Sequence, residues 1–286
     1  MLFGDGLLGT LCESAEPNGR AGGKVGIVLF NAGVVHRVGP HRIHVKLARA
    51  LAARGVPSIR FDTHSLGDSA SATGDLAYKD QILVDLRMAI DALQAASGVQ
   101  RISLLGFCSG VMPSVHAALA DARVVQIVLY DGLQVATRGS KLRHFLLRAR
   151  ALRPAIVTRW LRRVGAGIRD LPDRPSRSEP DSGGGAPNPS DVAPVLGELV
   201  SRGVDVVVMH AGADHSEVNS PRQAQQAFQA AGVRGLRFRL LDAADHVLSS
   251  VAAQKMFVQA LCTIVGEVSQ SVAAAHDSEL QRGEQV

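Results

Sequence analysis

The strongest chemical signal in this sequence is Cys108, which has one glycine two positions before it and another two positions after it. It follows an apolar run typical of a strand and precedes a helical pattern, the context of a nucleophile elbow. At such a sharp turn, side chains at the flanking positions would collide with neighbouring backbone. If Ser109 were the nucleophile, those positions would hold Phe107 and Val111, which are too large. We therefore predict Cys108 as the nucleophile, keep Ser109 as the alternative, and assign the Ser109 backbone N–H to an oxyanion hole.

An acid and a histidine follow Cys108 in chain order, each just after a strand-like run. The run 204–210 leads to Asp214, and the run 236–241 leads to His246. Nucleophile, acid and histidine occur in this order in α/β-hydrolases, and the carboxyl ends of parallel strands meet at one edge of a sheet. We predict His246 as the general base and Asp214 as the acid that orients it. Asp131, which also follows a strand-like run, is the alternative acid.

The turn after the first long apolar run, 25–30, could supply the second oxyanion donor. Its residues Gly33 and Val34 are small enough for a substrate to approach, so we predict that one of their backbone N–H groups points at the oxyanion. The alternative is an ordinary turn without a ligand. A buried, inert cysteine before a helix is likewise the alternative for Cys108.

Two arginines, Arg37 and Arg42, come shortly after this turn. A guanidinium can bind a carboxylate or phosphate through two parallel hydrogen bonds, so both arginines are candidate substrate-binding residues. The alternative is that they pin their own loop through Asp62 or Asp68.

The elements that must position these residues alternate along the chain between strands and helices. Alternation of this kind predicts an α/β fold with a mostly parallel sheet and helices on both faces. We expect a short N-terminal hairpin over 2–13, turned at Asp5-Gly6. The expected strands are 25–30, 56–61, 101–106, 124–130, 204–210 and 236–241, and the expected helices are 43–54, 79–96, 109–120, 192–202, 221–231 and 250–266.

The alternation stops once, which divides the chain into core and insert. Apolar spacing predicts two helices over 140–152 and 154–165, and the Pro- and Gly-rich stretch 172–191 predicts a flexible loop. We expect the insert to form a helical lid after the sixth strand. The predicted organisation is core over 1–132, lid and loop over 133–191, core again over 192–270, and a frayed tail over 271–286.

The positive charge of the chain is concentrated in this insert. Residues 138–169 hold ten of the 31 lysines and arginines and no acid, which leaves 21 basic against 26 acidic residues elsewhere. A basic module on a mildly acidic body indicates a local anionic partner rather than nucleic acid. The alternative is a solvated helical face.

Composition excludes several other classes of protein. An apolar content of 46% with 20% charged residues is typical of a soluble globule, and no uninterrupted apolar stretch approaches the ~20 residues of a membrane span. No secretory signal is visible at the N-terminus. Three cysteines and no Cys/His clustering indicate neither a disulfide framework nor a zinc site. We expect a cytoplasmic protein without metal or cofactor.

Three longer motifs are the R-x-G-x-H-R loop at 37–42, a D-x-x-G-x-G-D-S-like turn at 62–69 and the cysteine elbow. In these motifs the sequence resembles the α/β-hydrolases of the serine-aminopeptidase-like group, most closely the exosortase-A-system-associated hydrolase subgroup. The resemblance covers 1–132 and 192–266 and implies an α/β-hydrolase fold. At His64 and Ser65 the sequence departs from the subgroup's commoner Arg-Gly.

Together these features predict an enzyme that acts on an ester or thioester through an S-acyl-Cys108 intermediate and ends in hydrolysis. One alternative is an acyltransferase that moves an acyl group from a coenzyme A or acyl-carrier-protein thioester, held by the basic lid, to an amine or alcohol. Another is a catalytically silent binding module whose lid docks a partner. The three are distinguished by their products: free acid, an acyl adduct, or no acyl-enzyme at all.

Overall fold

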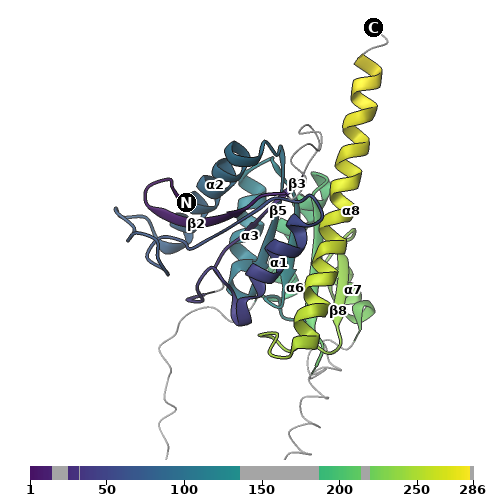
Figure 1. Cartoon of the computed structure of the whole chain (residues 1–286). Coiled ribbons are helices and arrows are strands. Elements are labelled where there is room, and N and C mark those ends of the chain that lie inside the picture. The colour runs from purple at the N-terminus through teal and green to yellow at the C-terminus, as the bar shows by residue number, and fades with distance from the viewer. Residues whose placement is uncertain (15–24, 32, 136–186, 214–219, 284–286) are drawn as a thin grey trace, which may run out of the picture.

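The computed structural model describes residues 1–14, 25–31, 33–135, 187–213 and 220–283 (Figure 1). The predicted lid helices 140–152 and 154–165 lie outside the described residues, as do most of the predicted loop 172–191 and Asp214. The two ends of the insert are described: Leu133 and Val135 are buried, and the Gln134 N–H donates to the Pro187 carbonyl at 3.0 Å. The chain therefore leaves the core and returns to it at one place.

An eight-stranded sheet in the order β1-β2-β4-β3-β5-β6-β7-β8 organises the described residues. The pairs β1–β2 and β2–β4 are antiparallel, and every pair from β4 to β8 is parallel. The prediction of a mostly parallel sheet with an N-terminal hairpin is confirmed. The strands are β1 Leu2–Phe3, β2 Leu7–Cys12, β3 Val25–Leu29, β4 Ser58–Phe61, β5 Arg101–Phe107, β6 Val124–Tyr130, β7 Asp205–Ala211 and β8 Arg237–Leu241.

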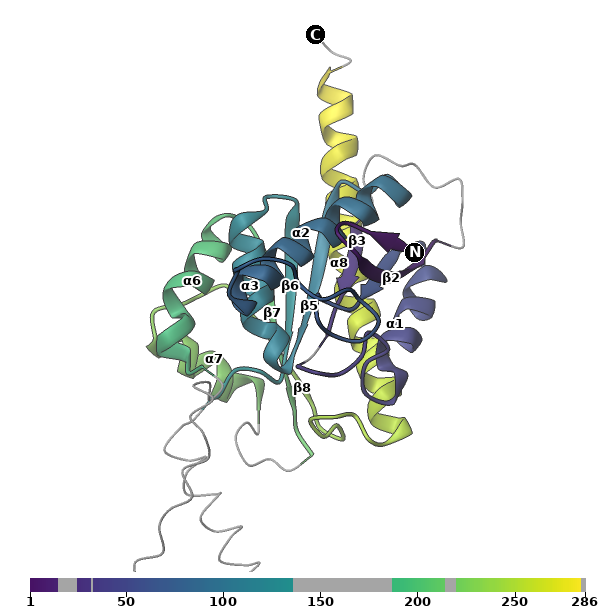
Figure 2. The ribbon, with the colours of Figure 1, turned by 90° about the vertical axis from the view of Figure 1, so that its left-hand side faces the viewer.

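Helices cover both faces of this sheet (Figure 2). One face packs against α1 (Ile43–Ala52) and α8 (Val251–Gly283) through an apolar cluster that includes Leu47 and Phe257. The other face packs against four helices through a second apolar cluster. These helices are α2 Tyr78–Ser97, α3 Val111–Ala120, α6 Pro189–Ser201 and α7 Pro221–Ala230. Strands β3, β5, β6 and β7 are almost wholly buried, because they lie between the two helical layers.

The last helix is longer than the sequence suggested. Helix α8 continues to Gly283, whereas we expected a frayed tail after about residue 270, and Figure 1 shows its last turns extending beyond the sheet. By length and composition alone, Val251–Val272 could cross a membrane. Its apolar side chains Ala253, Phe257 and Leu261 are fully buried against the sheet and α1, which explains their hydrophobicity without a membrane.

Candidate active site

The chain makes a strained turn at Cys108, directly after β5. Cys108 has a φ of +52°, a left-handed conformation that non-glycine residues rarely adopt, and Ser109 does not share it. A short 3-10 turn, Cys108–Gly110, then leads into α3. The strain therefore falls on the cysteine, as a nucleophile elbow with Cys108 at its apex requires.

Glycines around the elbow are required by close contacts. A Cβ atom on Gly106 would lie 2.8 Å from both the Gly110 carbonyl oxygen and Ser114 Oγ. A Cβ atom on Gly132 would lie 2.2 Å from the Cys108 carbonyl oxygen. The Gly132 contact also shows that the segment after β6 passes directly beside the Cys108 backbone.

His246 is hydrogen-bonded to Asp131. Its Nδ1 lies 2.6 Å from Asp131 Oδ2, and the two residues come from neighbouring loops at the carboxyl edge of the sheet. The hydrogen bond that Asp131 accepts raises the pKa of His246, whereas burial on its own would lower it. Among the described residues, Asp131, the alternative acid, makes the interaction that sequence analysis favoured for Asp214, which lies outside the described residues. Because β6 and β7 are adjacent and end at the same edge, sequence order could not decide between the two acids.

Hydrogen bonds to β7 hold both the backbone and the side chain of Asp131. The Asp131 backbone N–H donates to the Met209 carbonyl at 2.9 Å, and the Ala211 N–H donates to Asp131 Oδ1 at 3.3 Å. Burial alone would raise the pKa of Asp131, but His210 and His246 outweigh burial and lower it. Asp131 is therefore an anion at neutral pH, as an orienting acid must be.

A buried tyrosine positions the loop that carries His246. The Tyr130 hydroxyl donates to the Asp245 carbonyl at 3.0 Å. Burial, with Asp131 and Asp245 nearby, raises the pKa of Tyr130, so the hydroxyl stays protonated as a donor. The His246 ring also lies 6.2 Å, between centroids, from Phe107, the residue before Cys108. His246 is thus held close to the elbow while 47% of its side chain stays exposed.

The turn proposed for the second oxyanion donor lies beside the elbow. A Cβ atom on Gly33, which has a φ of +57°, would be 3.6 Å from Ser109 Oγ. The buried Asn31 side chain shapes this turn by donating to the Val35 carbonyl at 2.7 Å and to Asp62 Oδ1 at 2.9 Å. Gly33 and Ser109 are therefore neighbours, and Val34 next to them is 87% exposed.

Arg37 pins its own loop, so its interpretation as a substrate-binding residue is corrected. Its guanidinium forms ion pairs with Asp62 and, at 2.8 Å, with Asp68, and its backbone N–H donates to Asp62 Oδ1 at 2.6 Å. Its donors are therefore directed into the protein. Arg42 is exposed, with no ion pair recorded among the described residues, and its role stays a prediction.

One group of potential metal ligands occurs in the described part of the chain: His36, Asp62 and Asp68, whose ligand atoms lie within 4.8 Å of one another. The Arg37 guanidinium hydrogen-bonds both carboxylates and also lies 2.8 Å from His36 Nε2. A cation already present between these ligands opposes the binding of a second. The group does not fit a metal site.

The departure at His64 from the resembling subgroup has a structural explanation. His64 is buried, its Nδ1 lies 2.6 Å from Asp85 Oδ1, and its backbone N–H donates to Asp85 Oδ2 at 2.8 Å. Asp85 belongs to α2, so the pair fastens the loop after β4 to that helix. Burial disfavours the imidazolium, but the hydrogen bonds and charges of Asp85 and Asp5 together outweigh burial and raise the pKa of His64.

We expect Asp85→Asn to lower the free energy of unfolding by about 3 kcal/mol, because it leaves a buried imidazole without its anionic partner. Since the folded-state pKa of His64 is raised, the charged pair contributes fully below the unfolded value of ~6.5 and is lost as pH rises through the folded value. Urea titrations at pH 5.5 and 9 should therefore show a larger wild-type advantage at pH 5.5. An advantage that grows with pH would contradict the assignment.

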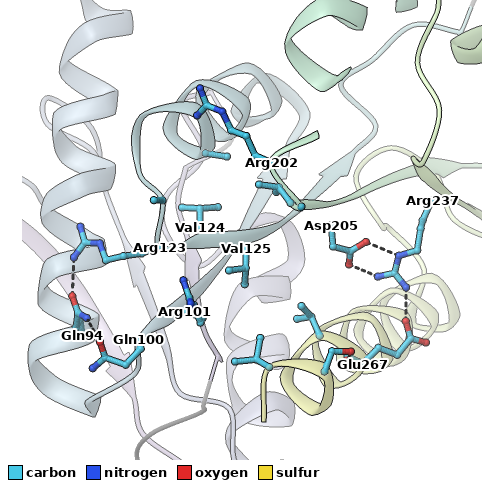
Figure 3. A pocket seen from close by; sticks show the side chains of 17 residues that line it. Gln94, Gln100, Arg101, Arg123, Val124, Val125, Arg202, Asp205, Arg237 and Glu267 are labelled. Carbon is cyan, nitrogen blue, oxygen red and sulfur yellow. Dashed lines mark hydrogen bonds and ion pairs between the residues drawn. The ribbon is translucent and has the colours of Figure 1, made fainter. Parts of the chain in front are cut away.

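A large cleft, of about 1090 Å³, lies at the opposite edge of the sheet (Figure 3). It is lined by the first residues of several strands, including Arg101, Val124 and Asp205. Arg237 is paired there with Asp205 and Glu267, and Arg123 bonds Gln94. Because the elbow and His246 follow the carboxyl ends of the strands, this cleft is not part of the candidate site.

Solved structures similar to this chain share its architecture. Proline iminopeptidase from Mycobacterium smegmatis has a TM-score of 0.57 and 15% identity, over 94% of this chain and 97% of that one. The esterase Est1E from Butyrivibrio proteoclasticus, solved with ferulic acid, has a TM-score of 0.53 and 15% identity, over 96% and 100%. The Pyrococcus furiosus esterase PF2001 has a TM-score of 0.52 and 12% identity, over 93% and 91%.

The chain has the α/β-hydrolase fold. No protein-family model matches the sequence, and no curated protein matches it either. At identities this low, similarity shows the fold alone, and the fold determines neither an activity nor a substrate.

Sequence analysis missed three residues that shape the candidate site. Tyr130, Asn31 and His210 each lie within two residues of the end of an apolar strand. A polar residue at the end of a buried strand was the available signal, because parallel strands place such residues at the edge where this fold has its site.

Proposed function

We propose that this protein hydrolyses an ester or thioester through an S-acyl-Cys108 intermediate, with His246 as general base and Asp131 as orienting acid. The observation that carries the proposal is the 2.6 Å hydrogen bond between His246 Nδ1 and Asp131 Oδ2, beside a strained cysteine elbow. That bond fixes the histidine tautomer and leaves Nε2 for the thiol.

In the first half-reaction, His246 Nε2 takes the Cys108 proton and the thiolate sulfur attacks the acyl carbon. The oxyanion that forms is bound by the backbone N–H of Ser109 and by that of Gly33 or Val34. Collapse breaks the bond to the leaving alcohol or thiol, which receives the proton from His246. In the second half-reaction, water loses a proton to His246 and attacks the thioester, and Cys108 leaves as a thiolate that is reprotonated.

The direct test is turnover of a panel of acyl thioesters and oxoesters of increasing chain length, followed by release of free acid. We expect free acid from at least one member with wild-type protein and none above background with Cys108→Ala. Cys12→Ala, a change at the far side of the sheet on β2, is the matched control and should keep full activity. Turnover of no member, or equal turnover by Cys108→Ala, would contradict the proposal.

A second candidate function, an acyltransferase fed by an acyl-carrier protein or coenzyme A, is favoured by one observation. The basic segment that begins at residue 138 leaves the core just after the Asp131 loop, and the chain returns next to Gln134 through the Pro187 carbonyl. The two described ends of the insert that contains this segment are therefore close to the Asp131 loop. A thioester intermediate reacts readily with amines, so adding an amine separates the two functions by product: free acid or amide adduct.

Reversing the charge of arginines in this segment tests whether the segment attracts an acyl-carrier protein. We expect the triple change Arg148→Glu, Arg159→Glu and Arg163→Glu to lower kcat/KM for a carrier-bound acyl group more than for a small neutral thioester. Rising salt should lower the wild-type value likewise, because the Debye length falls from ~10 Å at 0.1 M to ~3 Å at 1 M. Charge steering acts mainly on association, so kcat at saturation should change little.

The matched control reverses three exposed arginines on the described core, with the same change in net charge: Arg101, Arg222 and Arg234. We expect it to leave the preference for carrier-bound substrate unchanged. If the two triple variants show the same ratio of carrier-bound to free-thioester activity, the basic segment is only a solvated surface.

A further inference from the structure

A second histidine, His210, lies against the candidate acid from the side opposite His246. It is the penultimate residue of β7 and is only 4% exposed. Its Nδ1 lies 3.7 Å from Asp131 Oδ1, within ion-pair reach but longer than a hydrogen bond. Its Nε2 is buried and makes no hydrogen bond to the residues that the structure describes. A polar ring buried at this position calls for an explanation.

The two oxygens of the Asp131 carboxylate have different partners. Oδ2 accepts the short hydrogen bond from His246, whereas Oδ1 accepts the Ala211 N–H at 3.3 Å and faces His210. Rotation of the carboxylate would exchange these partners and lengthen the bond to His246. The 3.3 Å contact with the Ala211 N–H holds Oδ1 only weakly. The nearby Nδ1 of His210 can therefore add to the restraint on carboxylate rotation. Contacts of this kind are often long without substrate and shorten in the reacting complex.

We propose that His210 is a positioning residue that holds Asp131, through Nδ1–H directed at Oδ1, in the orientation that receives His246. Its effect on turnover rests on the proposed function, but its effect on the His246–Asp131 hydrogen bond does not. His210 acts on the reaction through the acid. In the protein with His210 intact, Asp131 offers Oδ2 to His246 throughout the reaction.

Three substitutions separate this role from simple filling of space. Asparagine has an amide nitrogen that can occupy the place of Nδ1, so His210→Asn retains the donor. Glutamine reaches instead toward the place of Nε2, and leucine has no donor. A positioning role through Nδ1 therefore predicts that His210→Asn resembles wild type and that His210→Gln and His210→Leu do not. A packing role ranks the variants by shape alone.

We expect His210→Leu and His210→Gln to lower kcat by at least about tenfold, and by up to the roughly 10²-fold that ~1 Å of misplacement costs. KM should change little, because His210 does not touch the substrate. His210→Asn should keep most of the wild-type kcat. Thermal melting of each variant establishes that it is folded, and if leucine is not tolerated, the Asn and Gln pair alone decides.

A second readout needs no substrate. The proton in the short His246 Nδ1–Asp131 bond should give a downfield proton NMR resonance, assigned by its loss in His246→Gln. We expect the resonance to persist in His210→Asn and to move upfield in His210→Leu and His210→Gln. If the resonance follows this pattern across the variants but wild-type protein turns over no ester or thioester, the proposed function fails and the positioning role stands. An unchanged resonance in His210→Leu, or equal shifts in the Asn and Leu variants, would overturn the role of His210.

Discussion

Cys108→Ala should abolish turnover, lowering kcat roughly 10³-fold or more, because it removes the thiol that forms the acyl intermediate. Ser109→Ala keeps the backbone N–H that stabilises the oxyanion, so it should retain most activity. The strained φ of +52° at Cys108, which Ser109 lacks, is the structural reason for this contrast. Steady-state kinetics on the best substrate of the panel measures it.

Cys108→Ser tests whether the reaction needs a thiol at this position rather than a hydroxyl. We expect the serine variant to be weakly active, because a hydroxyl has a much higher pKa than a thiol and needs a closer base. Equal losses in Cys108→Ala and Ser109→Ala would contradict the elbow assignment. Full activity in Cys108→Ala would contradict the whole mechanism.

His246→Ala should lower kcat/KM by about 10²–10⁴-fold, the usual contribution of a general acid–base group. Asp131→Asn should cost less, because the base remains but loses its anionic partner. Asp214→Asn is the matched comparison, since it removes the same charge from the other candidate acid, which lies outside the described residues. If Asp214→Asn were damaging and Asp131→Asn silent, the acid would be misassigned.

The pH dependence of His246 gives an independent check on the same pair. Because Asp131 raises the pKa of His246, Asp131→Asn should lower that pKa toward the ordinary value of ~6.5. The titration is best followed by NMR in a Cys108→Ala background, where no thiol titrates nearby. An unchanged or higher pKa would contradict the pairing.

The sequence predicted the fold well because its signals are local. Buried strands such as 124–130 are continuous apolar runs, and the glycine spacing at Cys108 is a steric requirement that the contacts of Gly106 confirm. The candidate site was harder to predict from the sequence, because its residues come together only in the folded structure. Asp131 and Asp214 both follow strands that end at the same edge, so choosing between them needs the geometry of two loops.

The role of Arg37 shows a different limit. An arginine near an oxyanion turn suits an anionic substrate, but two carboxylates from the loop after β4 already engage it. Likewise, the length of α8 could not be predicted from its apolar face, which ends where the sheet ends. For Arg37, the deciding contacts join segments that are distant in the sequence.

The most direct test of the central claim is intact-protein mass spectrometry after acid quench during turnover of an acyl thioester. We predict a mass increase equal to one acyl group. Hydroxylamine should remove this acyl group, and peptide mapping should locate it on the peptide that contains Cys108. The adduct should persist in Cys12→Ala and be absent from Cys108→Ala. An acyl group on Ser109, or an adduct that survives in Cys108→Ala, would contradict the account.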